Sequence, residues 1–167
     1  NYSDYREEHT EIQQRKIIVP PKKQWTEYAT KQWLIEYGFP IPKSKMIFYK
    51  DKDEITDYGW GLNFPVVLKG QSIDASHKTD YGLVKTNIYS QNDLREKLIN
   101  MWEIFDAQFS PERVEGILIE EQVQKGVEVI IGAKWDPLYG PALVFGSGGI
   151  FVEILNDIQV SKVPLNI

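Results

Sequence analysis

The stretch FPVVLKGQSIDASHKTD, residues 64–80, is the most informative part of this chain. Its apolar residues 65–68 predict a short buried strand that ends at Lys69, and small residues then predict a loop that leads to His77. A lysine at a strand end, beside a loop without bulky side chains, places a fixed positive charge where a phosphate chain can approach the backbone. A histidine ring nitrogen can accept a phosphoryl group. Taken alone, the stretch would also fit an exposed strand-end lysine and a surface histidine, so the prediction of phosphate chemistry depends on the motifs that accompany it.

Composition excludes several other classes of protein. The 167 residues contain no cysteine, so disulfides, thiolate metal sites and a cysteine nucleophile are excluded. A formal net charge of −5 argues against a broad nucleic-acid surface. No apolar stretch is long enough to span a bilayer, and the first residues are charged rather than signal-like. We expect a cytoplasmic protein with neither a nucleic-acid nor a membrane partner.

The order of elements predicts an α+β fold. Residues 1–20 are polar and are expected to form an N-terminal arm, and residues 21–167 are expected to form one domain of two small lobes. One helix is expected to end near Gly38, and a second is expected to begin after Ser90, which can cap it. Apolar spacing marks the buried face of the second helix, formed by Leu94, Leu98, Met101, Trp102 and Phe105. From residue 114 onward, closely spaced β patterns predict a mainly antiparallel sheet, and DPLYGP (136–141) predicts a tight hairpin turn.

An ordered series of motifs extends this prediction to a family. The series is GFPIPKSK (38–45), FPVVLK (64–69), HKTD (77–80), GVEVIIG (126–132), FGSGGIFVEIL (145–155) and a final Pro-Leu (164–165). It closely resembles the nucleotide-binding subunit of the ADP-forming acyl-CoA synthetases, ATP-grasp proteins related to the β subunit of succinyl-CoA synthetase. The resemblance runs from about residue 25 to residue 165. It implies an ATP-grasp-like fold of two small lobes with mainly antiparallel sheets and flanking helices, without the C-terminal part of the family fold.

The resemblance also implies ligands for particular residues. Lys69 matches a lysine that contacts the α- and β-phosphates of ATP or ADP, and His77 matches a histidine that relays phosphate. Glu153 and Asp157 lie four residues apart and would bind Mg²⁺ if the chain turns between them. Taken alone, such an acidic pair is more often part of an ordinary turn.

The adenine is expected over the hinge segment from Ile119 to Val123. Glu121 or Glu128 would bind the ribose hydroxyls or shape the hinge, and a strand-end acidic pair is otherwise a solvated edge. Gly148 belongs to a glycine run that lets the backbone approach either phosphate or a neighbouring strand.

The resemblance implies the activity acyl-CoA + ADP + phosphate ⇌ acid + CoA + ATP, with phosphate passing through a phosphohistidine. A CoA-binding, acyl-phosphate-forming partner would complete a hetero-oligomer.

Leu83, Ser147 and Ser161 depart from the family pattern, and an arginine expected at 161 is absent unless Lys162 replaces it. Family members also continue past residue 165, so a fragment, a split subunit and a degenerate subunit all stay open. The alternative function is a non-catalytic ATP-grasp module with a structural, nucleotide-binding or regulatory role.

Overall fold

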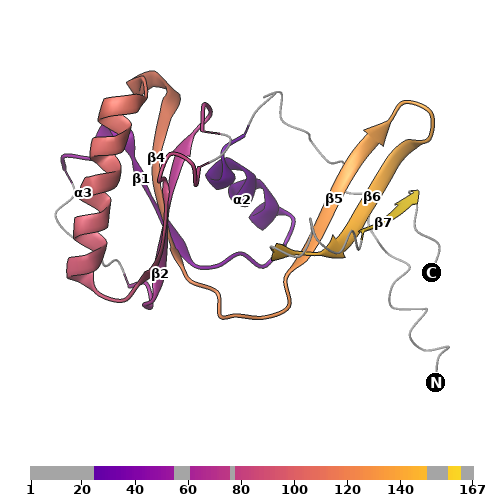
Figure 1. The fold of residues 1–167 in the computed structure, drawn as a ribbon, viewed down its shortest axis with the longest axis horizontal. Helices are drawn as coiled ribbons and strands as arrows, with labels where there is room; N and C mark the ends of the chain where they lie inside the picture. The colour runs from indigo at the N-terminus through magenta and orange to yellow at the C-terminus, as the bar shows by residue number, and fades with distance from the viewer. Residues whose placement is uncertain (1–24, 55–60, 76–77, 150–157, 163–167) are drawn as a thin grey trace. The chain divides into compact units, whose positions relative to one another are not determined.

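A computed structural model describes residues 25–54, 61–75, 78–149 and 158–162 (Figure 1). The expected N-terminal arm and the predicted site residues His77, Glu153 and Asp157 lie outside the described residues. The chain forms two compact units, Asn1–Gln122 and Val123–Ile167, which we call unit 1 and unit 2. The boundary between them falls inside the segment 119–123 that the sequence predicts to be a hinge.

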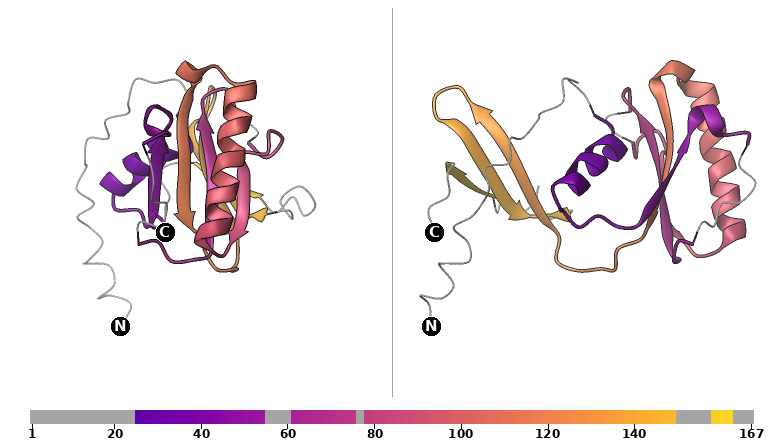
Figure 2. Two further views of the ribbon diagram at one scale, coloured as in Figure 1. Left: turned by 90° about the vertical axis from the view of Figure 1, so that its left-hand side faces the viewer. Right: turned by 180° about the vertical axis from the view of Figure 1, so that it is seen from behind.

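Unit 1 is built on a four-stranded sheet in which every strand pair is antiparallel. The strand order is β1-β4-β2-β3, with β1 at Ser44–Phe48, β2 at Val66–Ser72, β3 at Val84–Ile88 and β4 at Val114–Glu121. Of two short 3₁₀ turns, η1 (Tyr49–Asp51) follows β1 directly and η2 (Pro111–Arg113) leads directly into β4. Helix α3 (Gln91–Gln108) covers one face of the sheet and helix α2 (Glu27–Glu36) the other, as the views of Figures 1 and 2 agree.

The core of unit 1 lies between α3 and the sheet. Ser90 caps α3 as predicted, because its side-chain oxygen accepts a hydrogen bond from the backbone N–H of Asp93. The predicted apolar stripe is confirmed: Leu94, Leu98, Met101 and Phe105 are buried, and Trp102 packs against them. From the sheet, this core receives Val66, Leu68, Ile88, Ile117 and Ile119, and Leu83, just before β3, joins them. The side chains of one α3 face and one sheet face therefore exclude water together.

The face of the sheet toward α2 is different because it is partly polar. Gln71 and Glu120 are buried there, with 0% and 4% of their surfaces exposed. None of the residues of α2 is buried, and the helix ends as predicted, with Gly38 at φ +79° just after it. The Oε1 atom of Gln71 accepts a hydrogen bond of 3.1 Å from the backbone N–H of Tyr28. The start of α2 is thus fixed to β2 by a polar contact.

One expectation about the stretch 64–80 is wrong. Lys69 is the fourth of seven residues in β2, not its end, because the strand continues through Gly70 and Gln71 to Ser72. A Cβ atom on Gly70 would lie 2.8 Å from the ring of Phe105, so a small residue belongs to the packed strand here. The Ser72 hydroxyl donates to the backbone oxygen of Arg113 at 2.9 Å. Because the side chains of Gln71 and Ser72 both have hydrogen-bond partners, these polar residues can continue a buried strand.

Unit 2 is an antiparallel sheet in the order β5-β6-β7, with β5 at Val129–Asp136, β6 at Gly140–Ser147 and β7 at Ile158–Lys162. The turn between β5 and β6 is the predicted hairpin: the Asp136 carboxylate accepts 2.9 Å hydrogen bonds from the backbone N–H groups of Leu138 and Tyr139. Both backbone bonds lower the pKa of Asp136.

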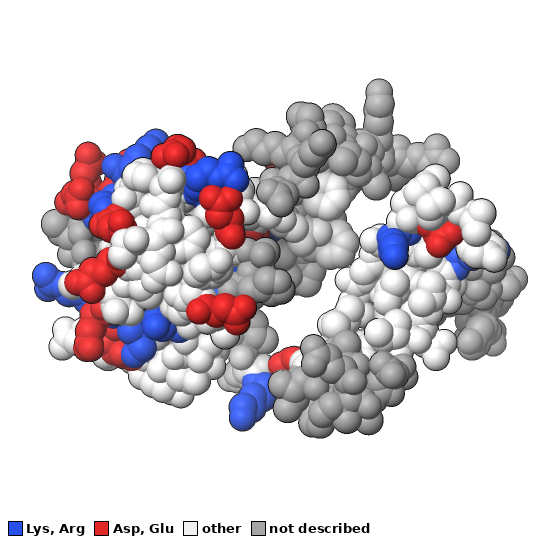
Figure 3. Space-filling view, turned by 45° about the horizontal axis from the view of Figure 1, so that its top comes forward, with Lys and Arg blue, Asp and Glu red and all other residues white. Residues whose placement is uncertain are grey.

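Charged side chains are distributed unevenly over the described surface. On the face shown in Figure 3, acidic and basic residues are interspersed over unit 1, whereas unit 2 presents mainly uncharged side chains. Unit 2 also has large apolar side chains that are exposed, including Ile131 at 72% and Trp135 at 71% exposure. None of the helices among the described residues is long and apolar enough to cross a membrane.

Candidate functional site

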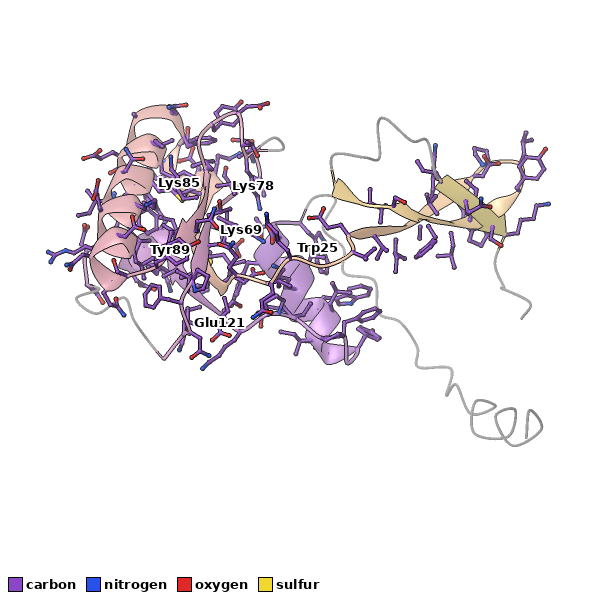
Figure 4. The ribbon with its side chains drawn as sticks, turned by 60° about the horizontal axis from the view of Figure 1, so that its bottom comes forward. Trp25, Lys69, Lys78, Lys85, Tyr89 and Glu121 are labelled. Atoms are coloured by element: carbon purple, nitrogen blue, oxygen red, sulfur yellow. The ribbon has the colours of Figure 1, made fainter. Side chains whose placement is uncertain are left out.

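Five charged residues meet between α2 and the sheet of unit 1, and we call them the ionic cluster: Glu27, Lys31, Lys69, Lys78 and Glu120. Three lysines and two carboxylates give the cluster a formal charge of +1. Lys69 comes from β2, Glu120 from β4, and Glu27 with Lys31 from α2. Figure 4 shows Lys69 and Lys78 on the side of unit 1 that faces α2.

Glu27 is the centre of the cluster. Its Oε1 atom accepts hydrogen bonds from the Nζ atoms of Lys31 and Lys69, both at 2.7 Å. Its Oε2 atom accepts one from Lys78 Nζ at 3.0 Å. Glu120 is a second anion, 2.5 Å from Lys31 and 3.6 Å from Lys69. One carboxylate therefore binds three amines from three different parts of the sequence.

The local sequence explains why Glu27 lies at this point. Thr26 is the N-cap of α2, and its side-chain oxygen accepts a hydrogen bond from the Ala29 N–H. The Thr26 hydroxyl in turn donates to a carboxylate oxygen of Glu115 on β4, which holds the helix start against the sheet. Glu27 then occupies the first helical turn, where the helix dipole favours a negative charge. Lys31 follows one turn later on the same helix face.

The environment stabilises the charged forms of both partners. Burial raises the pKa of Glu27, but hydrogen bonds from Lys31, Lys69 and Lys78 outweigh it and lower the pKa from 4.5 to about 2. For Lys69, burial lowers the pKa, whereas the hydrogen bond to Glu27 and the charges of Glu27 and Glu120 raise it above its ordinary value. Lys69 is thus a fixed cation at neutral pH.

The cluster has a chemical capacity that follows from this geometry. Lys69 and Lys78 already hold two oxygens of one anion with charge-assisted hydrogen bonds of 2.7 and 3.0 Å. Their side chains are 24% and 20% exposed, so both amines are partly desolvated yet still in contact with solvent. An arrangement that binds one oxyanion fits phosphate oxygens, which make the same kind of bond.

The predicted hinge residues of unit 1 have structural partners. The Glu121 carboxylate accepts hydrogen bonds from Asn63, 2.8 Å from its backbone nitrogen and 3.0 Å from its side-chain nitrogen. Both alternatives for Glu121, ribose binding and shaping of the hinge, stay predictions. The backbone N–H of Glu121 donates to the backbone carbonyl oxygen of Lys43, and that of Gln122 donates to the backbone carbonyl oxygen of Pro65, both at 2.9 Å. Ile119 is fully buried in the core, so only its backbone can face a ligand.

The predicted residues of unit 2 form a second small group. The backbone N–H of Gly148 donates to the backbone carbonyl oxygen of Glu128 at 2.7 Å, and a Cβ atom on Gly148 would lie 2.8 Å from the backbone of Glu128. The neighbouring chain is therefore one reason for glycine at this position. Val123, the first residue of unit 2, is 71% exposed. Among the described residues, no three carboxylate or histidine side chains are grouped so that they could hold a metal ion.

Of the ionic cluster, sequence patterns predicted only Lys69 as a site residue, and Glu27, Lys31, Lys78 and Glu120 were not predicted. Two signals were present: the four-residue spacing of Glu27 and Lys31 in a predicted helix, and the position of Lys78 next to His77. Glu120 gave no signal, because a carboxylate at a strand end is usually solvated.

Comparison with known proteins identifies the class. The ATP-grasp domain family matches residues 18–167, and the chain belongs to this family. It is 36% identical over 149 residues to the β subunit of ADP-forming acetate–CoA ligase II from Pyrococcus furiosus, a match that covers 89% of this chain and 62% of that one. It is 37% identical over 116 residues to ADP-forming acetate–CoA ligase I from Archaeoglobus fulgidus, covering 70% and 17% respectively.

Solved structures agree with this assignment. A structure of the dinucleotide-forming acetyl-coenzyme A synthetase 1 of Ca. Korarchaeum cryptofilum matches with a TM-score of 0.75 and 35% identity, covering 87% of this chain and 63% of that one. That protein was crystallised with coenzyme A, Ca-AMPCP and HgCl⁺. PH1788 from Pyrococcus horikoshii matches with a TM-score of 0.72 and 36% identity, covering 85% and 60%. The predicted family and its α+β ATP-grasp fold are therefore confirmed, and the chain spans less than two thirds of the length of these relatives.

Proposed function

We propose that this chain is the ATP-grasp, nucleotide-binding component of an ADP-forming acyl-CoA synthetase. In the net reaction, acyl-CoA, ADP and phosphate interconvert with an acid, CoA and ATP. The chain would bind ADP or ATP and transfer the phosphoryl group between the nucleotide and His77. A CoA-binding partner would form the acyl phosphate, in line with the relatives that are named β subunits.

The observation that carries the proposal is the pair of amines, Lys69 and Lys78, held on one carboxylate. The resemblance predicts a phosphate contact at Lys69, and the contacts of Lys69 fit an oxyanion. A related structure of the Korarchaeum enzyme, 31% identical with a TM-score of 0.65, contains Mg-AMPPCP and a phosphohistidine segment that points towards the nucleotide-binding site. That precedent supports a nucleotide site that a phosphohistidine segment can reach.

The remaining site residues complete the proposal. The segment from Ile119 to Val123 would lie along the adenine, and Glu128 and Gly148 would contribute further nucleotide contacts. Glu153 and Asp157 would hold Mg²⁺, which neutralises phosphate charge during phosphoryl transfer. Positioning and charge neutralisation, rather than covalent chemistry by many residues, would then account for the rate.

Nucleotide binding tests the first half of the proposal. We expect titration calorimetry with Mg·ADP to show binding by the wild type and at least about tenfold weaker binding by Lys69→Ala, because one charge-assisted hydrogen bond is lost. Lys45→Ala is the matched control, since Lys45 is an exposed lysine on β1 of the same sheet. Equal affinity of the Lys69 and Lys45 variants would contradict the site.

Phosphoryl transfer tests the second half. With γ-labelled ATP and Mg²⁺, with and without candidate CoA-binding partners, we expect acid-labile, base-stable label that His77→Ala abolishes. Nucleotide binding without any label would instead support the alternative function of a non-catalytic module, which the departure at Ser161 favours.

A further inference from the structure

Glu27 occupies the place where the proposed function requires a phosphate group. Both of its oxygens are bound by amines, Oε1 by Lys31 and Lys69 and Oε2 by Lys78. A ligand oxyanion that binds Lys69 and Lys78 together therefore meets a carboxylate that already uses the same donors. Each ammonium has three N–H donors, but a carboxylate and a phosphate held side by side on the same two amines repel each other.

The other contacts of the cluster show which bonds can be exchanged. Lys31 also binds Glu120 at 2.5 Å, so Lys31 keeps a counterion when Glu27 moves. Lys69 keeps only the longer 3.6 Å contact with Glu120. For Lys78, Glu27 is the one carboxylate partner within the described part of the chain. Lys69 and Lys78 are consequently the two amines that a ligand can recruit.

The position of Glu27 allows this exchange. Its side chain is 28% exposed, and it lies in the first turn of α2, whose backbone is fixed by Thr26 and by the contact between Tyr28 and Gln71. A change of side-chain rotamer can move the carboxylate without moving the helix. Lys31, one turn later, can keep one Glu27 oxygen in the new position.

We propose that Glu27 is a resident counterion that fills the phosphate position of the unliganded protein and is displaced by the polyphosphate of the nucleotide. It keeps Lys69 and Lys78 paired and in place, and it weakens nucleotide binding because it competes for both amines. This inference rests on the proposed function, since it assigns the regulation of affinity at that same site to one residue.

Three variants of the 167-residue chain test the competition, with Mg·ADP as the ligand and calorimetry as the readout. Glu27→Gln keeps the size of the side chain and removes its charge, and we expect about tenfold tighter binding, equivalent to about 1.4 kcal/mol. Glu27→Asp keeps the charge, so we expect it to gain less than Glu27→Gln. Glu36→Gln is the control, because it makes the same chemical change at an exposed position of the same helix.

Two outcomes would overturn the inference in different ways. Wild-type binding that Lys69→Ala weakens, together with equal or weaker binding by Glu27→Gln, refutes the competition and leaves the proposed function in place. No binding of Mg·ADP by either the wild type or Glu27→Gln refutes both.

A structure of the wild-type complex with Mg·ADP gives a test that does not depend on how well the variants fold. We expect the Glu27 carboxylate to lie more than 4 Å from the Nζ atoms of Lys69 and Lys78, with phosphate oxygens in its place. Contacts that persist at 2.7 and 3.0 Å beside bound nucleotide would overturn the inference.

Discussion

Acidification should remove a measurable part of the stability of unit 1 through Glu27. Because the pKa of Glu27 in the folded protein lies below its ordinary value, its contribution to stability is fully present above about pH 4.5 and is lost as the pH falls toward 2. A decrease from 4.5 to about 2, at 1.36 kcal/mol per pKa unit, corresponds to about 3 kcal/mol. The side chain is 28% exposed, and solvent screening reduces the expected value to about 1 to 2 kcal/mol.

The assay compares the wild type with Glu27→Gln by urea denaturation from about pH 6 to about pH 2. Far-UV circular dichroism reports on unit 1, since both α-helices among the described residues belong to it. We expect the free energy of unfolding of the wild type, minus that of Glu27→Gln, to fall by about 1 to 2 kcal/mol over this range. The subtraction cancels the other carboxylates of the chain.

The same subtraction with Glu36→Gln supplies the control, because Glu36 is exposed at the opposite end of α2. Its difference should stay within about 0.5 kcal/mol at every pH. A Glu27 difference as flat as the Glu36 difference would refute the structural assignment of three lysine contacts to one carboxylate.

Three further predictions concern the scaffold, each read out as the free energy of unfolding in urea. Phe105→Ala should destabilise unit 1 by about 3 to 5 kcal/mol because Phe105 is fully buried, whereas Ile99→Ala on the exposed side of α3 should change it by less than about 1 kcal/mol. Gly116→Ala should cost at least about 3 kcal/mol, since a Cβ there would lie 1.9 Å from a backbone oxygen of β1. Ser90→Ala should cost about 1 kcal/mol through the lost cap of α3. Values near zero for Phe105 or Gly116, or no loss at Ser90, would contradict the packing or the cap described here.

Local sequence patterns predicted the elements whose cause is local. The apolar stripe and the capping serine of α3 lie within eighteen residues of each other, and helix periodicity reports them directly. The same holds for the end of α2 at Gly38 and for the β5–β6 hairpin, because the residues that form each turn are adjacent in the sequence.

The features that the sequence did not reveal depend on distant partners. Gln71 and Ser72 are polar and suggest a loop, but Gln71 meets the start of α2, 43 residues away, and Ser72 meets Arg113, 41 residues away. The ionic cluster also depends on residues that are distant in the sequence. Lys69 and Glu27 are 42 residues apart, and Lys31 and Glu120 are 89 residues apart. Lys69 stood out locally by its place after an apolar run, and the family resemblance then assigned it a phosphate contact.

The two faces of the unit 1 sheet show why the cluster and the fold cannot be separated. Helix α3 is held by buried apolar side chains, and such packing gains nothing from charge. Helix α2 contributes no fully buried residue, and its contacts with the rest of unit 1 include polar contacts to Gln71 and Glu115, the ionic cluster, and an edge contact between Tyr28 and Phe48. The contacts that hold α2 are therefore partly the ones that a phosphate ligand would use. A ligand that displaces Glu27 must also replace part of what attaches α2, which couples occupancy of the site to the stability of this helix.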